Sequence, residues 1–96
     1  MLKKGELYKH FKGKNLDEKN IYEILEVGVK YSGDASENPI DNLVVYKNVF
    51  QGNIFARELS DLEAELPLQK QLEYGQVHRI EKLTAEEIEY IKSTGV

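Results

Sequence analysis

The chain has 96 residues, of which 41% are hydrophobic and 31% charged, and its formal net charge is −4 at pH 7. These values are typical of one small globular domain and argue against a disordered tail or a membrane protein. Because the chain contains no cysteine, a disulfide framework, a thiolate metal site and a cysteine nucleophile are excluded. We expect one cytoplasmic domain over residues 1–96, with a β core in 1–66 and a loop, a strand and a capped helix in 67–96.

Basic side chains are concentrated near the N-terminus. Residues 1–14 hold five lysines and one acid, whereas the rest of the chain is acidic. An acidic protein lacks the broad basic footprint of a general nucleic-acid binder. Tyr8, His10 and Phe11 nevertheless lie among these lysines, so two interpretations stay open. The segment is either a nucleic-acid contact with a stacking ring, or a first strand whose lysines face solvent and protect an exposed edge.

The first two predicted strands cover residues 7–12 and 21–31. In the first strand, alternation places Tyr8 and His10 on one face. In the second strand the alternation changes phase near the middle, and Gly28 favours a bend or β-bulge there. Polar and turn-forming residues predict loops at 14–20 and 32–39.

The strongest hairpin signal lies in the middle of the chain. Residues 43–50 are the most β-prone run, and Gly52–Asn53 separates them from a further strand at 54–59. This pair predicts a two-residue loop. In that register Lys47 faces Glu58. Both faces of the hairpin carry charge near the middle, so the pattern leaves open which face is buried.

Two capping boxes mark the C-terminal part. Ser60 with Glu63 predicts a helical turn over 61–66, and Thr84 with Glu87 predicts the start of a closing helix. The segments between them are predicted as a loop at 67–75 and a weak strand at 76–83. Five short strands with one closing helix predict a mainly β fold, in the form of a small closed barrel.

Four ordered motifs within residues 5–66 resemble a family of small bacterial proteins catalogued as domain of unknown function 1653. The motifs are Glu6–Gly13 (ELYKHFKG), Tyr22–Val27 (YEILEV), Leu43–Tyr46 (LVVY) and Phe55–Arg57 (FAR). Phe55 stands where the family usually has Trp, and Glu58 where it usually has Pro. The resemblance implies an SH3-like barrel and supplies no reaction.

The sequence gives little support for catalysis or for a cofactor. The serines do not lie in a nucleophile elbow, and a glycine-rich phosphate loop is missing. His10 and His78, the two histidines, have no partner at metal-ligand spacing. We therefore expect a protein that is not an enzyme and that has no cofactor and no metal site.

A ligand-binding groove is the candidate site that the pattern supports. Aromatic residues and one arginine share faces of the first strand and of the hairpin, an arrangement that suits a carboxylate or phosphate. These residues are Tyr8, His10, Tyr46, Phe55 and Arg57. In the alternative interpretation the hairpin rings, Phe50 included, fill the barrel and Arg57 bonds to loop carbonyls. We expect a non-catalytic module that binds a peptide, a small anionic ligand or another protein. A nucleic-acid contact and self-association through a strand edge are the alternatives.

Overall fold

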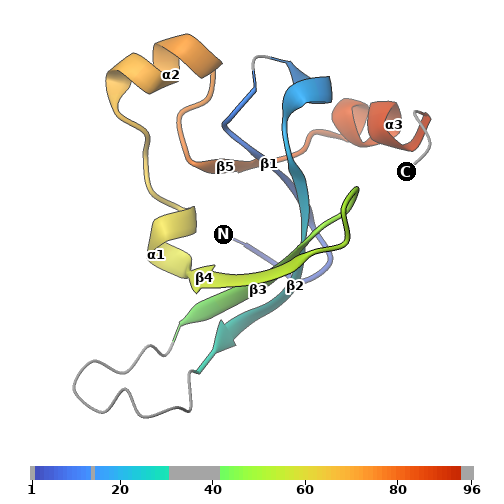
Figure 1. Cartoon of the computed structure of the whole chain (residues 1–96), viewed down its shortest axis with the longest axis vertical. Helices are drawn as coiled ribbons and strands as arrows, with labels where there is room; N and C mark the ends of the chain where they lie inside the picture. Colours follow the sequence, from blue (N-terminus) through green and yellow to red (C-terminus); the bar gives the residue numbers. More distant parts are fainter. Residues whose placement is uncertain (1, 14, 31–41, 94–96) are drawn as a thin grey trace.

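The structure is a computed structural model that describes residues 2–13, 15–30 and 42–93. It is mainly β, with one antiparallel sheet of five strands in the order β4-β3-β2-β1-β5 (Figure 1). The strands are β1 (Leu7–His10), β2 (Ile21–Val29), β3 (Leu43–Asn48), β4 (Ile54–Glu58) and β5 (Ile80–Lys82). The helical elements are the 3-10 turn η1 (Leu16–Glu18), α1 (Leu59–Leu62), α2 (Leu68–Tyr74) and α3 (Ala85–Ser93).

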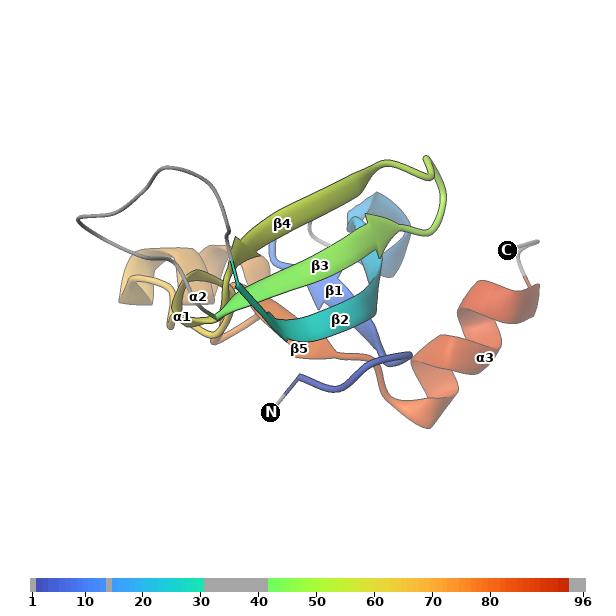
Figure 2. The ribbon, with the colours of Figure 1, turned by 90° about the horizontal axis from the view of Figure 1, so that it is seen from below.

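The sheet is strongly twisted, with α1 and α2 on one side of the molecule and α3 on the other (Figure 2). The described strands do not close on themselves, because β4 and β5 form its two edges without pairing to each other. The sheet is therefore open where a closed barrel was expected. The predicted loop at 32–39 lies outside the described residues. Within 2–13, 15–30 and 42–93, no helix has the length and apolar character needed to cross a membrane.

The predicted irregularity in β2 is confirmed. The pairing of β2 with β3 shifts register between Ile24 and Glu26 and again between Val27 and Val29. Gly28 lies in the second shift with a φ of +76°, a conformation that glycine adopts without the steric cost of a Cβ. Such irregularities bend a strand and increase its twist. The bent β2 pairs with β1 on one side and with β3 on the other.

Two hydrophobic cores lie on opposite faces of β2. Ile24 is 1% exposed and packs in a core that includes Tyr46 and Leu62 of α1. Ile21 is fully buried and packs with Ile91 of α3. Residues three apart on a strand point to opposite faces, so one strand anchors both cores. As a consequence, α1 covers one face of the sheet and α3 the other.

The predicted hairpin forms, but its loop is longer than expected. β3 and β4 pair with Lys47 opposite Ile54 rather than opposite Glu58. The two-residue loop predicted at Gly52–Asn53 is therefore wrong, and so is the predicted Lys47–Glu58 pair. β3 ends at Asn48, two residues before its predicted end, whereas β4 begins at Ile54 as predicted, so the residue opposite Lys47 moves by four positions, from Glu58 to Ile54. Because the shift is even, every side chain keeps its predicted face.

Asn48 explains the longer loop. Its Oδ1 accepts the backbone N–H groups of Phe50 and Gln51 at 3.0 and 2.9 Å, and its carbonyl accepts the N–H of Gly52 at 2.7 Å. An asparagine that closes a turn with its own side chain competes with the strand ladder. Asn48 is only 3% exposed, and it is also the last residue of β3.

Two predictions for the segment after the hairpin are wrong. The first helical turn runs from Leu59 to Leu62 rather than over 61–66, and it has no side-chain cap bond. Residues 67–75, predicted as a loop, contain α2, which ends at Gly75 with a φ of +68°. All residues of α2 are at least partly exposed, and its two leucines at helical spacing, Leu68 and Leu72, face solvent, so the helix buries no apolar face.

The predicted capping box of α3 is confirmed. The Thr84 N–H donates to Glu87 Oε1 at 3.0 Å, and the Glu87 N–H donates to Thr84 Oγ1 at 3.1 Å. Glu87 Oε2 also accepts from Lys9 Nζ at 2.8 Å, and both side chains are mostly buried. Burial alone would raise the pKa of Glu87, but the bonds from Lys9 and Thr84 together lower it. This ion pair ties α3 to β1.

We expect Glu87→Gln to lower the free energy of unfolding by about 1 kcal/mol at pH 7, because glutamine keeps the capping geometry and removes the charge that faces Lys9. Since the pKa of Glu87 is lowered in the folded state, this difference is present above the ordinary glutamate pKa. It is lost as pH falls through the lowered value. Urea unfolding of both proteins from pH 7 to pH 3 measures it.

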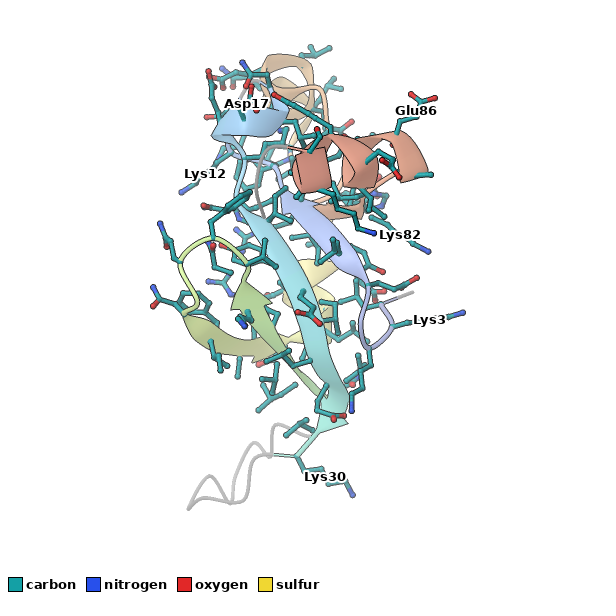
Figure 3. The ribbon with its side chains drawn as sticks, turned by 90° about the vertical axis from the view of Figure 1, so that its right-hand side faces the viewer. Lys3, Lys12, Asp17, Lys30, Lys82 and Glu86 are labelled. Carbon is teal, nitrogen blue, oxygen red and sulfur yellow. The ribbon has the colours of Figure 1, made fainter. Side chains whose placement is uncertain are left out.

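Glu86→Gln is the matched control, because Glu86 lies in the same helical turn and points into solvent (Figure 3). We expect this variant to unfold within a few tenths of a kcal/mol of the wild type. Equal effects of the two substitutions, or a Glu87→Gln effect that does not change with pH, would contradict the assigned role of the ion pair.

Candidate functional site

A small pocket opens on the face of the sheet that α1 covers. Its volume is about 190 Å³. Strands β1 to β4 contribute one or two side chains each, and α1 and the segment before β5 contribute one each. The lining residues are His10, Tyr22, Tyr46, Phe55, Arg57, Leu62 and Arg79. We call this the aromatic–arginine pocket.

The structure brings together four of the five residues predicted for the site, namely His10, Tyr46, Phe55 and Arg57. The fifth, Tyr8, lies outside the pocket and lines a different groove. The sequence interpretation missed three lining residues. Tyr22 could have been identified from the sequence, because it lies on an otherwise polar face of its strand. Nothing in the sequence pattern marks Leu62 or Arg79 as residues of the pocket.

The rings of the pocket form one continuous wall. Tyr22 meets Tyr46 edge-on, with ring centroids 4.9 Å apart, and Tyr46 stacks on Phe55 at 5.6 Å. His10 stands perpendicular to Tyr22 at 6.2 Å. Each such contact contributes about 0.5–1.5 kcal/mol beyond the area it buries. The rings therefore hold one another in place before any ligand arrives.

This wall runs from the core to the surface. Tyr46 is 8% exposed and belongs to the first core, but Phe55 is 42% exposed. Phe50, which the alternative interpretation placed inside a barrel, is 55% exposed and does not line the pocket. The hairpin rings thus do not all fill the interior, and Phe55 presents its ring to a ligand.

Neither arginine of the pocket has its charge neutralised by a carboxylate among the described residues. In the part of the chain that the structure describes, neither the Arg57 nor the Arg79 guanidinium forms an ion pair. The described lining of the pocket includes no carboxylate. Arg79 also borders a neighbouring hollow that contains Asp61 and Glu65, without an ion pair to either. The bonds from Arg57 to loop carbonyls that the alternative required are not seen among the described residues.

Burial and nearby cations keep the His10 ring uncharged. Burial, followed by the charge of Arg79, lowers the pKa of His10 from 6.5 to about 4. Smaller contributions come from Lys12, Arg57 and Lys19. The ring is therefore neutral at pH 7. Its Nδ1 accepts the backbone N–H of Lys12 at 3.3 Å, so its proton resides on Nε2.

The pocket therefore offers hydrogen-bond donors rather than a nucleophile. Burial, with a further contribution from Tyr46, raises the pKa of Tyr22 against the opposing charge of Arg57, so its hydroxyl stays protonated. Serine, threonine, aspartate and glutamate are missing from the described lining. No cluster of three or more metal-binding side chains occurs within the described residues. The chemistry suits recognition of a negative group.

Tyr8 lies in a groove of about 770 Å³ that carries charges of both signs. Its hydroxyl donates to Glu6 Oε1 at 3.1 Å, and Glu6 also pairs with Lys82. Burial raises the pKa of Tyr8 to about 12. Lys3 and Lys82 extend outward on this side of the molecule (Figure 3). The ion pair between Glu6 and Lys82 thus neutralises part of the charge in this groove. The described lining of the aromatic–arginine pocket has no carboxylate that could do the same.

The N-terminal segment buries both rings that the nucleic-acid interpretation named for stacking. Tyr8 is 5% exposed and Phe11 is 3% exposed. Two of the lysines are also engaged, Lys4 with Glu26 and Lys9 with Glu87. Stacking on a base needs an accessible ring face, and this segment buries both of its candidates.

Comparisons of the chain with protein-family models, with curated proteins and with solved structures give no match.

We expect Arg79→Gln to raise the pKa of His10 from about 4 toward its ordinary value, because the substitution removes the largest charge that opposes protonation of the ring. The pH dependence of the His10 ring signals in NMR spectra measures the change. Lys92→Gln removes the same charge from the last turn of α3 and should leave the pKa of His10 unchanged. A wild-type pKa near 6.5, or equal shifts in both variants, would contradict the assigned electrostatics.

Proposed function

We propose that this protein is a non-catalytic binding module that recognises an anionic group of a peptide or of another protein in the aromatic–arginine pocket. The observation that carries the proposal is the pairing of two guanidiniums without ion-pair partners, among the described residues, with a wall of aromatic rings. The absence of a carboxylate from the described lining distinguishes this pocket from the groove at Tyr8.

The size of the pocket limits what it holds. Sites for drug-sized ligands typically measure about 300–1,000 Å³, and this pocket measures about 190 Å³. A carboxylate-bearing side chain, a chain terminus or a small planar acid fits this volume, whereas a nucleotide cofactor does not. We therefore assign it one anionic group presented by a larger partner.

The electrostatics favour the same class of ligand. A guanidinium presents its N–H groups as a rigid fork that matches the two oxygens of a carboxylate. Rings that exclude water lower the local dielectric and strengthen this attraction. Because Arg57 and Arg79 lie on different elements, they can approach a bound anion from two sides. The neutral His10 adds a donor N–H without adding a charge.

We also propose that the curled sheet is a variant of the SH3-like barrel that the family resemblance implies. The support is the arrangement of five short antiparallel strands and the bend of β2. In this variant β4 and β5 leave a gap, and the aromatic–arginine pocket lies on the face where the strands curl toward α1. We likewise propose that the chain belongs to this family, on the four ordered motifs within residues 5–66.

Benzoate tests the pocket, because it joins a ring to a carboxylate at the size of a side chain, and benzamide is its neutral counterpart. We expect benzoate to produce saturable NMR shifts at Tyr22, Phe55 and the arginine side chains, and benzamide to produce much weaker ones. Arg57→Gln and Arg79→Gln should each weaken benzoate binding by about tenfold, since a hydrogen bond to a charged group contributes about 1.5–3 kcal/mol.

Lys47→Gln is the matched control, because it removes one charge from the neighbouring strand β3 at a position outside the pocket. This variant should bind benzoate as the wild type does. The proposal fails if benzoate and benzamide bind alike, or if the arginine variants lose stability in urea but keep the wild-type affinity for benzoate.

A further inference from the structure

The free edge of β4 is exposed, and of the features that protect edge strands it has only the charges of Arg57 and Glu58. Within the described residues β4 pairs with β3 alone, and all five of its residues are exposed. Its ladder with β3 runs without a register shift, and its sequence, Ile54–Glu58, contains neither proline nor lysine. Proteins commonly use prolines, lysines and bulges to prevent unwanted pairing at such an edge.

The opposite edge of the sheet is different. β5 has three residues, ends in Lys82 and leads into the capped helix α3. β4 is longer and presents two large apolar side chains, Ile54 at 62% and Phe55 at 42% exposure. The edge available for pairing is therefore that of β4.

The phase of the ladder shows which backbone groups point outward. The Asn48 N–H donates to the Asn53 carbonyl at 2.9 Å, and the Leu59 N–H donates to the Asn42 carbonyl at 3.0 Å. In an antiparallel pair every second residue exchanges such bonds. Residues 53, 55, 57 and 59 therefore bond toward β3. The N–H and C=O groups of Ile54, Ala56 and Glu58 point away from the sheet.

We propose that β4 pairs antiparallel with β4 of a second copy of this chain, about a two-fold axis at Ala56. The inference does not depend on the ligand proposed above. In this register Ala56 faces the partner's Ala56, and Ile54 faces the partner's Glu58. All three outward-pointing residues then bond across the interface, and two five-stranded sheets become one continuous sheet.

The two neighbouring registers, with the two-fold axis at Arg57 or at Phe55, are less favourable. An axis at Arg57 would set two guanidiniums opposite each other, and like charges directly opposite destabilise a strand pair. An axis at Phe55 would leave Glu58 beyond the partner strand, opposite the turn at Gly52. The axis at Ala56 places a small side chain at the centre and sets Phe55 opposite the partner's Arg57. A guanidinium beside a ring is a favourable contact.

This pairing has a consequence for the aromatic–arginine pocket. Phe55 and Arg57 both line it, and the axis sets them beside the partner's Arg57 and Phe55. The two pockets of the dimer therefore adjoin across the axis. The exposed Phe55 thereby gains a guanidinium from the partner chain, beside the two that already line its own pocket. A short strand pair buries less surface than a standard stable interface, so the dimer should be weak and concentration-dependent.

Sedimentation velocity of the full chain from about 10 μM to about 1 mM tests the pairing, a range that spans weak dimers. We expect the wild type to shift from monomer to dimer within this range. Ala56→Glu should weaken the dimer by about tenfold or more, because it places two carboxylates opposite each other. Ala56→Gln, its neutral counterpart, should stay close to the wild type.

Two further variants test the geometry. Ala56→Pro removes an N–H that points away from β3, a position where an edge strand tolerates proline, so it should stay folded by circular dichroism and sediment as a monomer. Ala56→Cys, in a chain without other cysteines, should cross-link its own copy much faster than Ser60→Cys, since paired Cα atoms at about 5.5 Å suit a disulfide.

Several outcomes would overturn the proposal. A wild type that remains monomeric up to about 1 mM would do so, as would an Ala56→Glu dimer as stable as that of Ala56→Gln. A monomeric wild type whose β4 amide signals shift on addition of an unrelated extended peptide would assign the edge to a foreign strand. Equal cross-linking of the Ala56→Cys and Ser60→Cys variants would contradict the axis at Ala56.

Discussion

The packing of β2 on both of its faces is the constraint on which the rest of the structure depends. Ile21 and Ile24 are almost fully buried, and each belongs to a different core. The strand cannot rotate or slip by one residue without exposing both, because a slip of one residue exchanges the faces of every side chain. The register of β1 and β3 on either side of β2 is fixed by the same requirement.

The site follows from this arrangement. The bend of β2 brings the end of β1, with His10, and the hairpin, with Tyr46 and Phe55, to one concave face. Lys4 and Lys9, on other parts of the surface, pair with Glu26 and Glu87. The two arginines at the pocket have no ion pair among the described residues, and the described lining contains no carboxylate.

The features predicted correctly were those encoded by short-range patterns. Alternation and Gly28 predicted the bend of β2, and Thr84 with Glu87 predicted the start of α3, because the responsible groups lie within a few residues of one another. The face shared by Tyr46, Phe55 and Arg57 was also predictable, since an even register shift preserves it.

The predictions failed where the structure depends on a side-chain bond or a long-range contact that the hydrophobic pattern of the sequence does not show. The hairpin loop was placed too late because Asn48 closes the turn with its own side chain, which an asparagine can do in many contexts. The seven-residue helix α2 buries no residue, and Arg79 reaches the pocket only because β5 pairs with β1. Whether the sheet closes into a barrel depends on the distance between its edges β4 and β5. That distance is set by the twist and bend of all five strands, which no short segment of the sequence determines.

A crystal structure of the protein with benzoate tests the central claim most directly. We expect the carboxylate to lie between Arg57 and Arg79, within hydrogen-bond distance of both guanidiniums, and the benzoate ring to lie against Tyr22 or Phe55. Benzoate bound elsewhere, or guanidiniums turned away to pair with the protein's own carboxylates, would contradict it.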